Sequence, residues 1–329
     1  MPVVKGAHGR HERKSVPIRP KSPERLTQGH GFTNNLHAIQ PFDRAINWGW
    51  AVMGAPGFLR GEKAMGQPHF IVFANEKGGT GKSTTAVHTA VALAAKGLKV
   101  AAIDLDHRQR TMTRYLENRT KTIDRLGKPL AQPAFEVLED LTEAGLEAAI
   151  QRLGASADVI VIDTPGRDDP VARAAILKAD TLVTPMNDSF VDLDLIGQVD
   201  PDTYKVTRPS FYAELIWNSR TQRAKQVGKS VDWVVLRNRL QHIDSHNLRR
   251  VGAALDELAR RVGFRVIPGL GERVIYRELF PKGLTLLDLA EIGDASIAHV
   301  AARQELREMI AGLSVPDRDE MPEAIAATA

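Results

Sequence analysis

The sequence predicts an α/β fold with a doubly wound, mainly parallel sheet flanked by helices. Two observations support this fold: short β-branched runs alternate with amphipathic stretches from His69 onwards, and several of these runs are apolar on both faces. Strands buried from both sides are typical of parallel sheets covered by helices. The 329 residues, 43% hydrophobic and 26% charged, are sufficient to bury a substantial core.

The elements follow in order along the chain. The β-branched runs predict strands at His69–Ala74, Lys99–Leu105, Asp158–Ile162, Thr181–Thr184, Val231–Leu236 and Phe264–Ile267. Apolar residues at helical spacing mark two helices, one through Val87, Ala90, Val91 and Ala94 up to Gly97, the other through Leu146, Ile150 and Leu153 up to Gly154. A last long helix is expected from Ala295 to Leu313.

Residues 1–64 differ from the rest of the chain in charge and in hydrophobic periodicity. They hold 10 Lys and Arg against 4 Asp and Glu, and show no apolar period of a strand or helix. We expect a disordered basic head, and two interpretations stay open: an arm that touches nucleic acid, or a stretch upstream of a true start at Met65. Residues 65–313 are then the folded domain, and residues 314–329 a short acidic tail.

The composition excludes several classes of protein. The chain has no cysteine, which removes disulfides, thiolate-held zinc, cysteine-ligated iron–sulfur clusters and cysteine nucleophiles, and makes a reducing cytoplasm the default. No stretch approaches the roughly 18 consecutive apolar residues that a membrane-spanning helix needs. We therefore expect no membrane-spanning segment.

Positive charge gathers in Lys205–Arg265, which holds 13 Lys and Arg against 5 Asp and Glu. Such clustering favours a surface that faces a polyanion, with an ordinary solvated surface as the open alternative. The candidate cations for DNA phosphates are Arg220, Arg223, Lys225, Arg249 and Arg250. No aromatic residues interleave with them, so we expect backbone contacts without base readout.

The strongest motif is Glu76-Lys77-Gly78-Gly79-Thr80-Gly81-Lys82-Ser83-Thr84, which follows the first strand and precedes a helix. This is the context of a phosphate-binding loop. Its glycines let successive backbone N–H groups converge on phosphate oxygens, and the helix N-terminus adds partial positive charge. Lys82 is expected to reach the β- and γ-phosphates, and the Ser83 hydroxyl to ligate Mg²⁺.

The loop departs from the common pattern, because Glu76 stands where its first glycine is expected and a second lysine, Lys77, follows. This deviant form, KGGxGK[ST], resembles the ParA and MinD group of P-loop ATPases. The resemblance implies ATP as the nucleotide, held by the loop from Gly78 to Thr84. It also implies a nucleotide-sandwich homodimer in which Lys77 reaches across to the partner's ATP.

Acidic and amide side chains follow three of the predicted strands. Asp163 ends an apolar strand and is suited to hold the Mg²⁺ shell as a Walker B carboxylate. Asp104 and Asp106 close the second strand; in the group that the sequence resembles, the second of these acids lies near the attacking water. The resemblance therefore implies that Asp106 positions water and that Asp104 supports the Mg²⁺ region. Asn238 matches the position at which related ATPases contact adenine.

Longer segments are similar to the MipZ family, ParA-like ATPases that place the division site in alphaproteobacteria. They are Gly78–Arg110, Thr184–Asp192, Asp232–Leu240 and Arg273–Pro281, within a likeness that covers about Pro68–Leu313. The resemblance implies an ATP-switched inhibitor of FtsZ assembly that is recruited by ParB and retained on chromosomal DNA as the ATP dimer. It also implies a cytoplasmic, nucleoid-associated protein enriched toward the cell poles.

Other members of the group fit less well. Nitrogenase-reductase-like and iron–sulfur carrier relatives need cysteines, which this chain lacks. A MinD-like membrane-cycling protein would end in a basic amphipathic helix, whereas Ser314–Ala329 has four acids against one Arg, so we expect no direct membrane insertion. Two alternatives stay open: a ParA-type chromosome or plasmid partitioning ATPase, and a metabolic P-loop enzyme of the dethiobiotin-synthase type.

Overall fold

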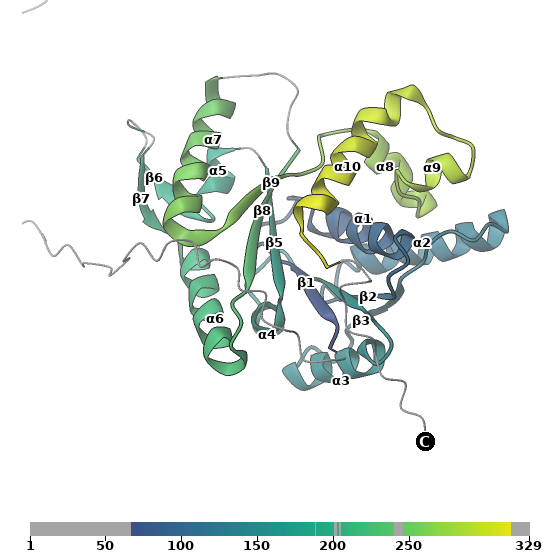
Figure 1. The fold of residues 1–329 in the computed structure, drawn as a ribbon, viewed down its shortest axis with the longest axis horizontal. Coiled ribbons are helices and arrows are strands. Elements are labelled where there is room, and N and C mark those ends of the chain that lie inside the picture. The colour runs from purple at the N-terminus through teal and green to yellow at the C-terminus, as the bar shows by residue number, and fades with distance from the viewer. Residues whose placement is uncertain (1–66, 188, 201–202, 204, 240–245, 317–329) are drawn as a thin grey trace, which may run out of the picture. The chain divides into compact units, whose positions relative to one another are not determined.

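The computed structural model describes residues 67–187, 189–200, 203, 205–239 and 246–316 (Figure 1). Within these residues, a seven-stranded sheet has the order β3-β2-β4-β1-β5-β8-β9, and every neighbouring pair is parallel. Its strands are β1 His69–Phe73, β2 Val100–Asp104, β3 Ala134–Val137, β4 Val159–Asp163, β5 Thr181–Asn187, β8 Asp232–Asn238 and β9 Arg265–Pro268. An antiparallel pair joins β6 Gly197–Val199 and β7 Val206–Pro209.

Helices cover both faces of the sheet, as Figure 1 shows. One face packs against α1 Lys82–Ala95, α2 Thr111–Leu126, α8 Ile275–Leu279, α9 Asp288–Glu291 and α10 Val300–Gly312. The other packs against α3 Glu143–Gly154, α4 Pro170–Lys178, α6 Phe211–Val227 and α7 His246–Leu258. Shorter turns are α5 Phe190–Leu193, a π-helical turn Ala259–Gly263, and 3₁₀ turns Phe280–Lys282 and Ile297–His299. The predicted doubly wound α/β fold is confirmed.

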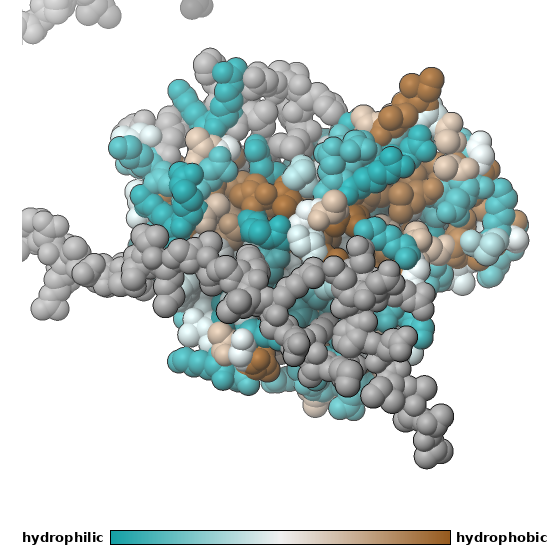
Figure 2. Space-filling model, in the orientation of Figure 1, coloured by the Kyte–Doolittle hydropathy of each residue, from teal (hydrophilic) through white to brown (hydrophobic). Residues whose placement is uncertain are grey.

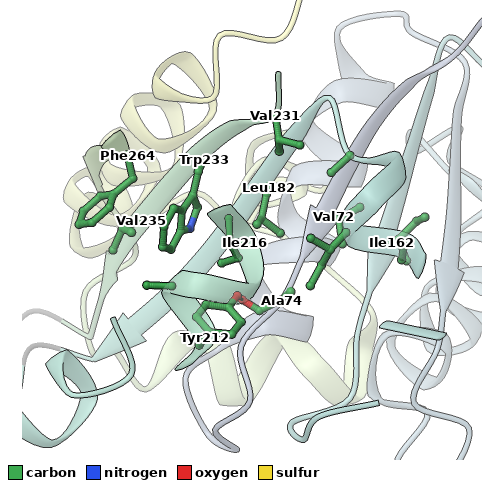
Figure 3. Close-up of a cluster of buried hydrophobic side chains, with 14 of the residues drawn as sticks. Val72, Ala74, Ile162, Leu182, Tyr212, Ile216, Val231, Trp233, Val235 and Phe264 are labelled. Carbon is green, nitrogen blue, oxygen red and sulfur yellow. The ribbon is translucent and has the colours of Figure 1, made fainter. Parts of the chain in front are cut away.

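The central strands are buried on both sides, which is why they appear in the sequence as continuous apolar runs. Ile71, Val72 and Phe73 of β1 have no exposed surface, although their side chains alternate between the two faces. Figure 3 shows the layer between the sheet and α6, where Tyr212 and Trp233 lie among aliphatic side chains. The indole of Trp233 and the ring of Tyr212 meet edge-on with centroids 6.3 Å apart. Both faces therefore contribute a packed hydrophobic core.

All six predicted strands are present. The structure differs from the prediction in an additional edge strand, in the start of the last helix and in further elements. β3 has no apolar signal because it is an edge strand whose side chains are half-buried or exposed. The last α-helix begins at Val300 rather than Ala295, because a 3₁₀ turn precedes it. The Ser296 hydroxyl caps this turn by accepting a hydrogen bond from the amide of Ala298. The antiparallel strands β6 and β7 were not predicted from the sequence, and neither were the helices α2, α4, α5, α6, α7, α8 and α9.

Two predictions about the ends of the chain are not tested. The head predicted for residues 1–64 and residues 317–329 of the predicted tail lie outside the described residues. Across the helices that the structure does describe, none combines the length and the apolar character needed to cross a membrane.

Candidate nucleotide site

The residues predicted to bind and hydrolyse nucleotide lie together at the carboxyl edge of the sheet. The loop after β1 continues into α1, and the last residues of β2 and β4, Asp104 and Asp163, are register partners. Phe73, the last residue of β1, pairs with Asp163 on its other side. Crevices at the carboxyl ends of parallel strands are the usual ligand sites of doubly wound sheets. The topology thus assembles the site from segments distant in sequence.

The loop has the backbone geometry of a phosphate cradle. Gly79 and Gly81 adopt left-handed φ angles of 76° and 90°, and a Cβ on Gly81 would lie 2.2 Å from the side-chain nitrogen of Asn238. No side chain caps the first turn of α1, whereas Thr142 caps α3 and Ser210 caps α6 by accepting backbone hydrogen bonds. A helix whose first amides lack a side-chain cap is suited to bind phosphate.

The loop lysine, Lys82, is buried beside the carboxylates of the site. Its Nζ donates to the carbonyl oxygen of Lys77 at 2.8 Å, and only 6% of the residue is exposed. Burial lowers the pKa of this ammonium, while the charges of Asp163 and Asp106 oppose the shift. The ammonium therefore lies across the loop, among the groups that are predicted to surround a bound triphosphate.

Asp163 has the environment of a cation ligand. The residue is 1% exposed, and neither carboxylate oxygen has a partner at hydrogen-bonding geometry. Burial, followed by the charge of Asp104, raises its pKa to about 8, against the opposing effects of the nearby Ser83 hydroxyl and the Lys82 ammonium. A buried carboxylate without partners is costly unless a cation or proton neutralises it. Its position fits the predicted Mg²⁺ site.

The protein would supply only part of a Mg²⁺ shell. Among the described residues, no group of three or more His, Asp or Glu side chains is arranged to hold a metal ion by itself. Mg²⁺ typically binds one or two protein oxygens together with substrate phosphates and water. Ser83 and Asp163 would hold the ion in this way, and its chemistry would be to neutralise charge on the phosphates.

Binding of Mg²⁺–ATP is expected to release a proton from Asp163. With a pKa of about 8, the carboxyl group of the nucleotide-free protein is mostly protonated at neutral pH, and a metal ligand must be ionised. Affinity should therefore rise by up to about tenfold per unit as the pH increases from about 6 to 8, and level off above it. Calorimetry in buffers of different ionisation enthalpy measures the proton. The release should be absent in Asp163→Asn; identical release in that variant would contradict the assignment.

Asp104 is buried and holds the segments around the site in place. It has no exposed surface; Oδ1 accepts from the amide of Asp106 at 3.0 Å, and Oδ2 accepts from the amide and hydroxyl of Thr113 at 3.0 and 3.1 Å. Both oxygens are thus engaged in fixing the loop after β2 and the start of α2. This arrangement favours the supporting role that was predicted for Asp104 over direct ligation of the metal.

The Asp106 loop is tightly built. The Asp106 carbonyl accepts from the amide of Arg110 at 2.7 Å, and its carboxylate accepts from the amide of Gln109 at 3.2 Å. Arg110 adopts a left-handed φ of 49°, which is uncommon for a residue with a Cβ. Strained backbone of this kind clusters at functional sites. The water-positioning role of Asp106 stays a prediction.

Lys77 is held within its own subunit. Its Nζ donates to the carbonyl oxygen of Val191 and lies 3.6 Å from Oδ1 of Asp192, both in α5. The other oxygen of Asp192 accepts from the amide of Asn187 at 3.0 Å, which ties this contact to the end of β5. Asp192 was not predicted as a site residue, although it lies in one of the segments similar to the MipZ family. The predicted contact of Lys77 with a partner's nucleotide would require this contact to break.

Asn238 joins the phosphate loop to the loop after β9. Its side-chain nitrogen donates to the carbonyl of Thr80 at 2.9 Å, and its oxygen accepts from the amide of Leu270 at 2.9 Å. The residue is 3% exposed. The structure thus gives Asn238 a bracing role beside the nucleotide loop, and the predicted adenine contact is not tested.

A close contact between Gly166 and the phosphate loop was not predicted from the sequence. Gly166 follows the Walker B strand, and a Cβ there would lie 3.1 Å from Cα of Gly78 in the phosphate loop. Thr164, two residues earlier, donates through its hydroxyl to the carbonyl of Phe73 at 3.0 Å. The loop after β4 is therefore packed directly on the phosphate loop.

The predicted DNA-binding cations divide into two groups. Lys225, Arg249 and Arg250 are exposed. Arg223, by contrast, is buried and pairs with Asp180 at 2.7 Å, and Arg220 is half-buried with its guanidinium donating to the carbonyl of Gly263 at 2.6 Å. These internal partners give Arg223 and Arg220 a role in holding the fold together, so we leave both out of the proposed DNA surface; their predicted contact with DNA is not tested.

Replacement of Arg223 by alanine is expected to destabilise the protein. The half-buried carboxylate of Asp180 would lose a charged hydrogen bond, a change worth about 1.5 to 3 kcal/mol. Urea denaturation measures the free energy of unfolding, and Lys225→Ala on the exposed side of the same helix is the matched control. Equal stability of the two variants would contradict the structural role.

Comparisons with known proteins show which family the chain resembles. The family model described as ATPase MipZ matches residues 69–317. The chain is 26% identical to the protein ParA of Rhizobium radiobacter over 213 residues, which are 65% of this chain and 82% of that protein. It is 32% identical to the septum site-determining protein MinD of Helicobacter pylori over 156 residues, 40% of this chain and 58% of that protein.

Solved structures support the fold. Apo McdA of Cyanothece superposes with a TM-score of 0.52 at 19% identity, covering 74% of this chain and 98% of that one. An ATP complex of a McdA variant of Cyanothece gives a TM-score of 0.51 at 18% identity, covering 79% and 99%.

Proposed function

The chain belongs to the ATPase MipZ family, a ParA/MinD-type family of P-loop ATPases, and on this premise we propose that it is an ATP-dependent dimeric regulator of cell division. It inhibits FtsZ assembly away from midcell and couples division-site placement to chromosome segregation through ParB. The observation that carries the proposal is the second lysine of the phosphate loop, Lys77, whose half-buried ammonium lies 3.6 Å from Asp192 in its own subunit.

In the proposed cycle, the phosphate loop and Lys82 bind the triphosphate while Ser83 and Asp163 face the metal. Bound Mg²⁺–ATP supplies the phosphoanhydride whose hydrolysis resets the switch. Lys77 exchanges its contact with Asp192 for the nucleotide of the partner subunit, which makes dimerisation depend on ATP. Asp106 orients the attacking water. The output is a conformation, and slow hydrolysis returns the subunits to the monomeric state.

Dimerisation also strengthens the proposed retention on nonspecific DNA. If each subunit neutralises about three phosphates, the slope of log affinity against log salt steepens from about −2.7 for a monomer to about −5.4 for a dimer. Lys225, Arg249 and Arg250 are the exposed candidates from the basic region. Contacts to the backbone alone hold the protein on any sequence.

The direct test mixes purified protein with polymerising FtsZ. With ATP, the wild-type protein should shorten FtsZ polymers, as measured by sedimentation and electron microscopy. Lys77→Ala, with Lys96→Ala as the matched exposed-lysine control, should lose this effect. Unchanged polymer length with ATP and wild-type protein would contradict the proposal and favour a ParA-type partitioning role.

A further inference from the structure

The exposed side of α2 carries a line of basic residues that the sequence analysis did not single out. Arg114, Lys121 and Arg125 are exposed, and their spacings of seven and four residues place them within about 40° of one another around the helix. Arg110, directly before the helix, is half-buried, and its guanidinium lies 3.3 Å from the carboxylate of Glu117, so it is not part of this line. From Arg114 to Arg125 the line spans about 16 Å at 1.5 Å per residue.

The opposite side of α2 is firmly anchored. The buried guanidinium of Arg119 pairs with Asp288 through contacts of 2.6 and 2.7 Å, and the Tyr115 hydroxyl donates to the carbonyl of Leu284 at 2.6 Å. At the start of the helix, Thr113 binds Asp104. The basic line is therefore presented on a rigid support, and its first end is fixed to the nucleotide site.

The chemistry of this face favours a polyanion over a folded protein. Leu126 is the one large apolar residue of α2 that is exposed in the described structure, at 38%, and it lies about 100° around the helix from Arg125. Protein partners generally anchor on buried aromatic or aliphatic side chains, which this line does not offer. The phosphate backbone of a duplex needs only positioned cations.

We propose that the basic face of α2, defined by Arg114, Lys121 and Arg125, binds the phosphate backbone of duplex DNA. This inference rests on the proposed DNA retention and adds a surface for it. Figure 1 shows α2 on the other side of the molecule from α6 and α7, in agreement with its packing near β2 and β3. The contact therefore lies beside the loop that carries Asp106, where the two subunits and their nucleotides are expected to meet.

The test compares three triple variants of equal charge. The α2 variant is Arg114→Gln, Lys121→Gln, Arg125→Gln. The second variant replaces the exposed cations Lys225, Arg249 and Arg250 by Gln, and the control replaces Lys96, Lys99 and Lys229 by Gln. The control lysines each precede a strand of the parallel sheet and lie at its amino edge. Fluorescence anisotropy with a mixed-sequence duplex, across a salt series with ATP, gives the slope for each variant.

With the three α2 cations added to the three proposed above, about six contacts per subunit give the ATP dimer a slope of about −10.8. We expect the α2 variant to flatten this slope by about 5.4, and the control to keep the wild-type slope. Melting temperature and ATP-dependent sedimentation establish that each variant folds and dimerises. A wild-type slope in the α2 variant would overturn the proposal. A wild-type slope combined with loss of FtsZ inhibition would also overturn it and assign the face to an acidic protein. Absence of DNA binding by the wild-type ATP form would instead refute the proposed DNA retention itself.

Discussion

Lys77→Ala is expected to bind ATP and remain monomeric. The phosphate-loop amides and Lys82 are predicted to hold the nucleotide within one subunit without the Lys77 side chain, since Lys82 contacts the backbone carbonyl of Lys77. The proposed contact across the dimer does depend on that side chain. The loss of a charged contact to phosphate on both sides of a symmetric interface is worth several kcal/mol, enough to weaken dimerisation by about a hundredfold or more. Sedimentation velocity with ATP measures the dimer, and nucleotide affinity is measured separately.

The matched control is Lys96→Ala, an exposed lysine just after α1 and distant from the carboxyl edge of the sheet. It should dimerise as the wild type does. A Lys77→Ala dimer of wild-type stability would remove the proposed role of this lysine. The contact with Asp192 would then describe a structural link between the phosphate loop and α5 rather than a resting position.

Asp106→Ala is expected to accumulate as an ATP dimer that turns over very slowly. Removing a residue that orients the attacking water costs about 10² to 10⁴ in rate, while the contacts of the phosphate loop with the nucleotide are retained. The variant should therefore stay on DNA longer than the wild type does. Steady-state phosphate release and the dimer lifetime after dilution into ADP are the two readouts.

Asp124→Ala, an exposed acid on α2, serves as the control for loss of one carboxylate. Its phosphate release should match that of the wild type. Wild-type turnover in Asp106→Ala would refute the water-positioning assignment. A fall in turnover together with loss of the dimer would refute it as well, because the proposed role concerns hydrolysis alone.

The parts of this protein that the sequence predicted well are those with local physical causes. Buried parallel strands require apolar runs, so β1, β4 and β8 were visible without any knowledge of their neighbours. The phosphate loop requires glycines at positions with left-handed φ, so its composition and its place between strand and helix defined it. Asp163 was identifiable because it directly ends such a strand.

What the sequence could not supply are contacts between distant segments. The burial of Arg223 against Asp180 depends on how α6 lies across the sheet. Its basic neighbours in the sequence had instead suggested an exposed, DNA-facing position. The partner of Lys77 lies 115 residues away in α5, and only the folded chain brings Asp192 beside it. The line of cations on α2 was hidden because the helix itself had not been predicted.

Sedimentation velocity of the full chain with ATP and with ADP tests the central claim most directly. If two subunits enclose two ATP molecules and Lys77 crosses between them, the protein should sediment as a dimer with ATP and as a monomer with ADP. The addition of nonspecific duplex should shift only the ATP form to a larger species. A single subunit with either nucleotide would contradict the account.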